Sequence, residues 1–132
     1  MSTKSTSKFT IDSWDERLYH EAANGGKLTR AHVKQTFSGD IEGQGEVQWL
    51  MCYRPDRTAD FVGLQHFTGR VGERSGSIVL ETRGTFDGQA ATGPLRIVPG
   101  SGTDELSGIS GDGELRAPLG GPASITLAYR FE

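Results

Sequence analysis

Four side chains that could orient a bound molecule recur on one face of the predicted strands. They are two glutamines, a tryptophan and a threonine: Gln35, Gln65, Trp49 and Thr82. Buried polar groups require partners, so these side chains either bond to one another or line a small cavity that holds water or a ligand. Tyr53 and Tyr129 lie nearer to the predicted barrel ends and add two hydroxyl groups.

The same face carries no carboxylate in the predicted alternation, because Glu46 and Glu81 fall on the opposite parity. A proton-transfer mechanism would then depend on Tyr53, Tyr129 or an acid in an end loop, such as Asp60. The residue pattern thus argues against general acid–base catalysis and leaves open whether the protein is an enzyme.

Metal and cofactor sites are not favoured by the spacing of the candidate ligands. The three histidines, His20, His32 and His66, lack the short repeats typical of a metal site. The single cysteine, Cys52, excludes an intrachain disulfide and a cysteine-rich zinc site. We therefore expect neither a metal nor a cofactor.

The glycine-rich stretch VPGSGTDELSGISGDG at 98–113 would suit either a phosphate group or a tight connection. A Walker loop needs a lysine after its last glycine, and a dinucleotide fingerprint needs glycine where this chain has Glu105. We predict a connection at one barrel end, with a short turn at 104–106. Leu106 and Ile109 are expected to plug that end.

Apolar and polar residues alternate along almost the whole chain, which is typical of half-buried strands. The clearest runs are 8–13, 30–37, 46–53, 61–67, 78–86, 91–97 and 125–131. So many strands of this length should close, because closure removes exposed edges. The pattern predicts an all-β fold, a closed eight-stranded antiparallel meander barrel. One or two short helical turns are expected, the first within 13–22, where Ser-Trp-Asp-Glu resembles a capping box.

Turn signals indicate which residues face one another. A tight turn at Asp87-Gly88 would put Leu80 opposite Leu95, and the loop at 54–60 allows Trp49 to face Gln65. Inward residues then face inward residues in every hairpin. A one-residue slip would reverse the faces.

The outward face carries an apolar patch formed by Leu50, Cys52, Val62 and Leu64. Such a patch needs cover, which the helical turn within 13–22 or a second subunit could supply, and we expect a homo-oligomer that forms through it. Cys52 in this setting is expected to be packed rather than nucleophilic.

Length and composition predict one domain. The chain has 132 residues and a net charge of −3, and we expect a flexible tail at 1–6 followed by a barrel domain at 7–132. No basic stripe suggests a nucleic-acid partner, and the apolar runs are too short to cross a membrane. The N-terminus lacks the apolar core of a signal peptide, so we expect a cytoplasmic protein.

Several sequence segments resemble motifs of an uncharacterised family of bacterial domains. They include GDIEGQG at 39–45, FVGLQHFTG at 61–69, GTFDG at 84–88 and the stretch at 98–113. The resemblance covers about residues 8–132, and the family is assigned to the allene-oxide-cyclase-like β-barrels. It implies an eight-stranded barrel and no established activity. The wider barrel class includes cyclases and isomerases that fold an apolar substrate in the lumen without a cofactor, which is an analogy of fold alone.

The leading hypothesis is a barrel that binds a small apolar molecule in its lumen, either as a binding protein or as a cofactor-free cyclase or isomerase. Gln35, Trp49, Gln65 and Thr82 would orient the ligand, with Tyr53 and Tyr129 near the mouths. The alternative is a non-catalytic oligomeric scaffold or interaction protein, which the outward apolar patch suggests.

Overall fold

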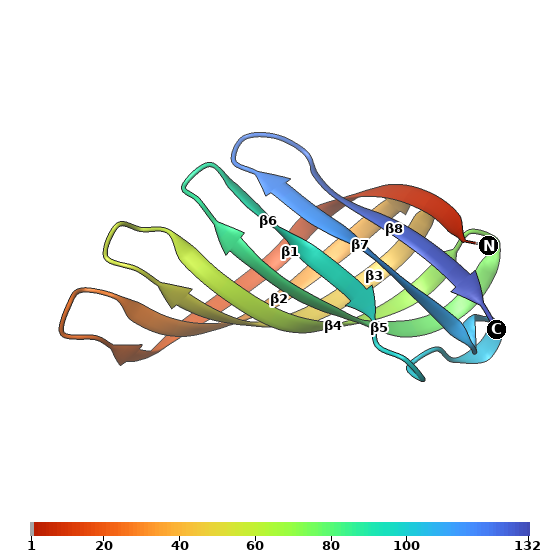
Figure 1. Ribbon diagram of the computed structural model, residues 1–132, viewed down its shortest axis with the longest axis horizontal. Coiled ribbons are helices and arrows are strands. Elements are labelled where there is room, and N and C mark those ends of the chain that lie inside the picture. The colour runs from red at the N-terminus through yellow and green to blue at the C-terminus, as the bar shows by residue number, and fades with distance from the viewer. Residues whose placement is uncertain (1) are drawn as a thin grey trace.

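Eight antiparallel strands, joined in chain order, form a closed barrel in the computed structural model, which describes residues 2–132 (Figure 1). The strands are β1 (Thr3–Glu21), β2 (Lys27–Gly39), β3 (Ile41–Tyr53), β4 (Ala59–Val71), β5 (Arg74–Phe86), β6 (Ala90–Ile97), β7 (Ile109–Pro118) and β8 (Ala123–Phe131). One turn of 3₁₀ helix, η1 (Asp104–Leu106), lies between β6 and β7. The predicted all-β meander barrel is confirmed.

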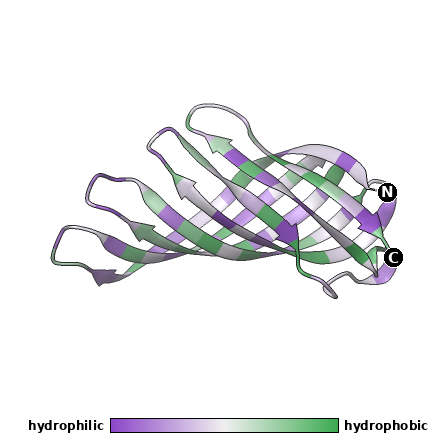
Figure 2. Cartoon of the chain, viewed as in Figure 1, coloured by the Kyte–Doolittle hydropathy of each residue, from purple (hydrophilic) through white to green (hydrophobic). Residues whose placement is uncertain are grey.

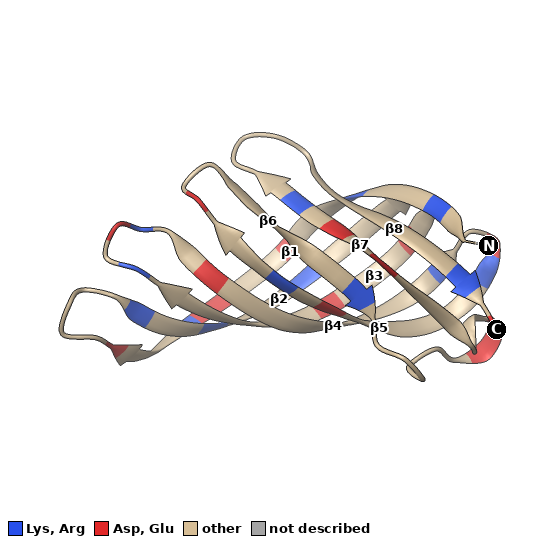
Figure 3. Cartoon of the chain, viewed as in Figure 1, with Lys and Arg blue, Asp and Glu red and all other residues tan. Residues whose placement is uncertain are grey.

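Each strand presents apolar side chains to the lumen and polar ones to the outside. Figure 2 shows hydrophobic and hydrophilic residues alternating along the ribbons, and Figure 3 shows the two signs of charge interspersed on the strands. Phe37, Phe67 and Ile78 are among the core side chains with almost no exposure. Within the described residues, no helix has the length and apolar character needed to cross a lipid bilayer.

The lumen is filled by aromatic rings that face glycines on the neighbouring strand. Three such pairs are Trp49 opposite Gly63, Phe61 opposite Gly84 and Phe67 opposite Gly45. A Cβ atom on Gly84 would lie 2.7 Å from Cζ of Phe61, so the ring occupies the space of the missing side chain. At these positions the narrow barrel interior accommodates a large residue against a small one.

This pairing corrects the predicted register. Trp49 faces Gly63 instead of Gln65, and the other hairpins in the predicted register are likewise shifted by an even number of residues. One cause is loop length, because Tyr53 pairs with Ala59 and leaves a shorter loop than the one predicted at 54–60. An even shift preserves the faces, so the predicted division into inward and outward residues remains correct.

Two other predictions, both for residues that belong to β1, are wrong. Residues 3–6, expected to be a tail outside the barrel, pair with β8, and residues 13–21, expected to be partly helical, pair with β2. The ladder with β2 is irregular between Ile11 and Ser13, and again between Leu18 and His20. Each irregularity adds a residue to the two-residue alternation. The large apolar residues Ile11, Trp14 and Leu18 are therefore spaced by three and four, which imitates a helical pattern.

The glycine-rich connection covers an exposed edge of β5 at the end that holds both termini (Figure 1). The ladder between β5 and β6 begins only at Leu80. Before that point, the backbone N–H groups of β5 donate to side chains of the connection. These bonds are Ser75 to Glu105 at 2.9 Å, Ser77 to Thr103 at 3.0 Å and Val79 to Ser101 at 3.0 Å.

The same connection seals this end of the barrel. Leu106 is fully buried, and Ile109 joins it in the core. The predicted turn at 104–106 and the two predicted plugging residues are therefore confirmed.

The opposite end of the barrel is open and oblique. The hairpins β1–β2, β3–β4, β5–β6 and β7–β8 end there in a stagger, with β1–β2 projecting farthest (Figure 1). Strand β1 pairs with β8 only as far as Phe9. Beyond Phe9 the inner face of β1 is therefore not enclosed by β8, and this region is called the mouth below.

We predict that Gly63→Ala destabilises the barrel by about 1–3 kcal/mol, because the added methyl group overlaps the Trp49 ring. Denaturant unfolding measures the loss, and Leu64→Ala, at an exposed neighbour, should change stability by less than about 0.5 kcal/mol. Adding Trp49→Phe to Gly63→Ala should recover part of the loss. Strict additivity of the two changes would contradict the proposed contact.

Candidate functional site

A small cavity lies inside the mouth. Its volume is about 80 Å³, well below the roughly 300 Å³ of the smallest usual ligand pockets. Its walls include Phe9, Gln35, Trp49, Met51, Phe61, Ala91, Leu115 and Ala117. Ile11 and Trp14 complete the lining, and they are 50% and 45% exposed. The cavity can therefore take one end of an apolar molecule, while the remainder would lie against the mouth.

A carboxylate on the inner face of the mouth is held by three side chains. Glu16 accepts hydrogen bonds at Oε2 from Thr29, at 2.6 Å, and from Tyr53, at 2.7 Å. The indole N–H of Trp14 donates to Oε1 at 2.9 Å. We call Trp14, Glu16, Thr29 and Tyr53 the mouth cluster.

The mouth cluster keeps its carboxylate charged. Partial burial would raise the pKa of Glu16, but the hydrogen bonds from Thr29, Tyr53 and Trp14 and the charge of Lys27 outweigh it, so the pKa is lowered. Burial and the neighbouring Glu16 carboxylate raise the pKa of Tyr53. The pair therefore consists of an anionic acceptor and a neutral hydroxyl donor near neutral pH.

The two predicted glutamines meet in the core. Nε2 of Gln65 donates to Oε1 of Gln35 at 2.7 Å. Their side chains meet above Gly45, where a Cβ atom would lie 2.6 Å from Nε2 of Gln65. Gln35 also lines the small cavity. The bond accounts for one donor and one acceptor of this pair, as expected if the polar side chains bond to one another.

The other predicted lumen residues are spread along the barrel. Trp49 is buried and packs edge-on against Phe61, with ring centroids 5.0 Å apart. Thr82 is buried on β5. Gly63 on β4 lies between it and Trp49 on β3 and pairs with both. Tyr53 belongs to the mouth cluster.

Tyr129 is buried at the closed end, beside Gly72 and near Phe131. Gln35, Trp49 and Tyr53 lie in or near the mouth, and Tyr129 does not.

Glu16 is the residue that the sequence pattern missed. The predicted helical turn removed it from the alternation, so the lumen seemed to lack an inward carboxylate. The bulge near Asp12 restores Trp14, Glu16 and Leu18 to the inner face, opposite Val33, Ala31 and Thr29. A bulge leaves no reliable mark in a single sequence, and the acid-rich segment around Trp14 was the only available signal.

The predicted outward patch lies on the outer face as expected. Leu50, Val62 and Leu64 are exposed there, and Cys52 is a free, exposed thiol. Among residues 2–132, no three His, Cys, Asp or Glu side chains are grouped so that they could hold a metal ion. Burial of the patch against a second copy stays a prediction.

Comparisons with known proteins identify a family. The family model described as "Protein of unknown function (DUF3224)" matches residues 5–129. A crystal structure of a DUF3224-family protein of unknown function from Shewanella oneidensis MR-1 shares 26% identity and a TM-score of 0.79, covering 100% of this chain and 99% of that chain. A search of the curated proteins finds no match. The narrower likeness to allene oxide cyclases stays a prediction.

We predict that Gln65→Leu destabilises the protein by about 1–3 kcal/mol, because it leaves the buried amide of Gln35 without its partner. The double variant Gln35→Leu/Gln65→Leu should be more stable than the sum of the single changes indicates, as it removes both amides. Thermal or denaturant unfolding of the four proteins of this cycle measures the coupling. A coupling of zero would show that the two amides do not depend on each other.

We predict that Glu16 makes folding sensitive to acid. Because its pKa is lower in the folded state, its stabilisation is present above the ordinary carboxyl value of 4.5 and is lost as the pH falls through the lowered value. Urea unfolding between about pH 6 and about pH 3 should show a smaller loss of stability for Glu16→Gln than for the unchanged protein. Glu21→Gln, at an exposed acid of the same strand, is the control, and an equal pH dependence in all three proteins would refute the role of Glu16.

Proposed function

The chain belongs to the DUF3224 family, whose members are described as proteins of unknown function, and we propose that it binds a small, elongated apolar molecule at the mouth. One end of the ligand enters the 80 Å³ cavity, and its polar end contacts the mouth cluster. The observation that carries the proposal is the apolar cavity that opens between half-exposed Ile11 and Trp14, directly beside a hydrogen-bonded carboxylate.

Exposed apolar side chains at the mouth support this proposal. Ile11, Trp14 and Leu18 all lie on the inner face and are about half exposed. Large apolar side chains grouped around an opening are unfavourable in water, and a ligand that covers them gains hydrophobic free energy. The surface that binds is therefore wider than the cavity.

The charge of Glu16 selects the polar end of the ligand. Oε2 accepts two hydrogen bonds and Oε1 accepts one, which leaves Oε1 able to accept another. A hydroxyl or an amine can donate to it, whereas a carboxylate would be repelled. The proposed ligand class is thus an aliphatic or aromatic alcohol or amine.

Binding fits the mouth cluster better than the cyclase or isomerase alternative does. A general base works best when its pKa lies near the working pH. The three hydrogen bonds on Glu16 move its pKa in the opposite direction. The cluster is therefore built to hold a fixed negative charge rather than to take up a proton.

We predict that octylamine and 1-octanol bind in the mouth and shift the indole N–H signals of Trp14 and Trp49 in the NMR spectrum of the unchanged protein, which has two tryptophans. Ala117→Leu fills the cavity and should weaken binding by about tenfold, which corresponds to about 1.4 kcal/mol. Ala22→Leu, in the exposed turn after β1, makes the same chemical change outside the cavity and should have no effect. Octanoate should bind more weakly than either compound.

Equal affinity of Ala117→Leu and the unchanged protein for octylamine would overturn the proposal, because the cavity would then not take part. Preference for octanoate over octylamine would show that Glu16 does not select the polar end.

A further inference from the structure

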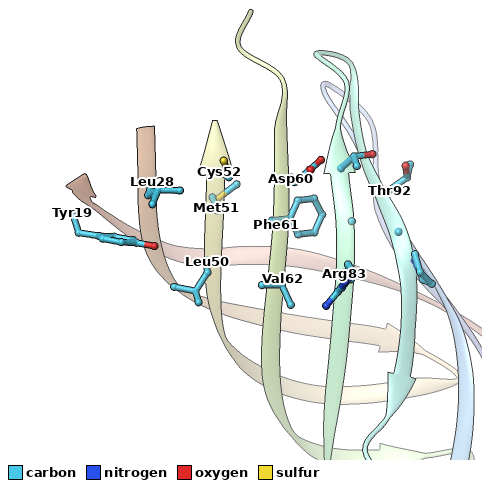
Figure 4. Close-up of a pocket in the computed structure, with 14 residues that line it drawn as sticks. Tyr19, Leu28, Leu50, Met51, Cys52, Asp60, Phe61, Val62, Arg83 and Thr92 are labelled. Carbon is cyan, nitrogen blue, oxygen red and sulfur yellow. The ribbon is translucent and has the colours of Figure 1, made fainter. Parts of the chain in front are cut away.

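A wide groove lies on the outside of the barrel, behind the mouth. Its volume is about 720 Å³, and its lining is mainly apolar. Tyr19, Leu28, Leu50 and Val62 form one side of it across β1 to β4 (Figure 4). A hollow of this size lies within the usual range of small-molecule sites, about 300–1,000 Å³.

The groove runs across β5 and β6, where two glycines line it. The ladder between these strands is interrupted between Thr82 and Thr85, and Gly84 and Gly93 lie in the gap. The two backbones approach so closely that a Cβ atom on Gly93 would lie 2.5 Å from Cα of Gly84.

One positive charge in the groove has no acidic partner. Arg83 lies beside Val62 on the neighbouring strand and lines the groove (Figure 4), and it forms no ion pair with any residue from 2 to 132. The nearby acids are already engaged. Asp60 pairs with Arg54 at 2.6 Å, and Glu81 pairs with Arg96 at 2.8 Å.

We propose that this groove is a binding site for a small amphipathic carboxylate, such as a medium-chain fatty acid. The carboxylate would pair with the guanidinium of Arg83, whose planar fork matches its two oxygens. The alkyl chain would lie over Leu50, Val62 and Leu28 toward Tyr19. This site takes the opposite charge to the mouth and is a second function, independent of the one proposed above.

The single cysteine provides a local reporter for the test. Cys52 is exposed in the groove wall, one strand from Asp60. Because the chain has no other cysteine, its rate of alkylation reports on this groove alone. Decanoate should slow alkylation of Cys52 in a saturable manner, and equal concentrations of decyltrimethylammonium should not. Protection at equal strength by both compounds, or by neither, would overturn the proposal.

Arg83→Gln should weaken the protection by decanoate by about tenfold, on the order of one charge-assisted hydrogen bond. Arg17→Gln removes the same charge from an exposed position on β1 outside the groove and should leave the protection unchanged. Circular dichroism of both variants checks that the barrel is intact. Unaltered protection in folded Arg83→Gln would refute the role of Arg83.

Two further measurements distinguish the groove site from the lumen cavity and from an interface between two copies of the chain. Ala117→Leu, which fills the lumen cavity, should leave the decanoate effect intact, so failure of one proposed site does not decide the other. Sedimentation velocity tests whether the predicted outward patch joins two copies instead. Concentration-dependent dimerisation that protects Cys52 without decanoate would show that the groove is a protein interface and would overturn its assignment as a ligand site.

Discussion

The contact between an aromatic ring and a glycine on the next strand is the constraint on which the rest of the barrel depends. Trp49 on Gly63, Phe61 on Gly84 and Phe67 on Gly45 fill the lumen from one side of each strand pair. The rings of Trp49 and Phe61 occupy the space where Gly63 and Gly84 lack a Cβ atom, and the Phe67 ring lies close to Gly43 and Gly69. The contacts therefore fix how far one strand is shifted along its neighbour, and they leave little room in the centre of the lumen.

This constraint explains which parts of the fold could be predicted. The alternation of apolar and polar residues identifies inward and outward faces, because that property depends only on even or odd position. The exact partner of Trp49 depends on turn length and on volume. The predicted register placed large inward residues opposite other inward residues irrespective of size, and the barrel instead pairs Trp49 and Phe61 with glycines. A pattern of hydrophobicity does not contain that information, although the positions of Gly45, Gly63 and Gly84 do.

The same reasoning applies to the candidate site. Gln35 and Gln65 could be predicted to meet because both lie on the inner face, and they do so above Gly45, with the shifted register. Glu16 could not, because its place on the inner face depends on a bulge. One extra residue in β1 turns an alternating strand into a sequence that imitates a helix, and the carboxylate disappears from the predicted lumen.

The exposed strand edges are hydrogen-bonded at one end of the barrel and left without a partner strand at the other. At the closed end, Ser101, Thr103 and Glu105 accept the hydrogen bonds that a neighbouring strand would otherwise accept from β5. At the open end, β1 continues past the last residue that pairs with β8, and no loop of the described chain replaces the missing partner. Because the rings occupy the centre, a ligand could enter the lumen only at the mouth. The proposed mouth site and the proposed groove site lie on opposite sides of β3 and β4, with Met51 and Phe61 in the lining of both.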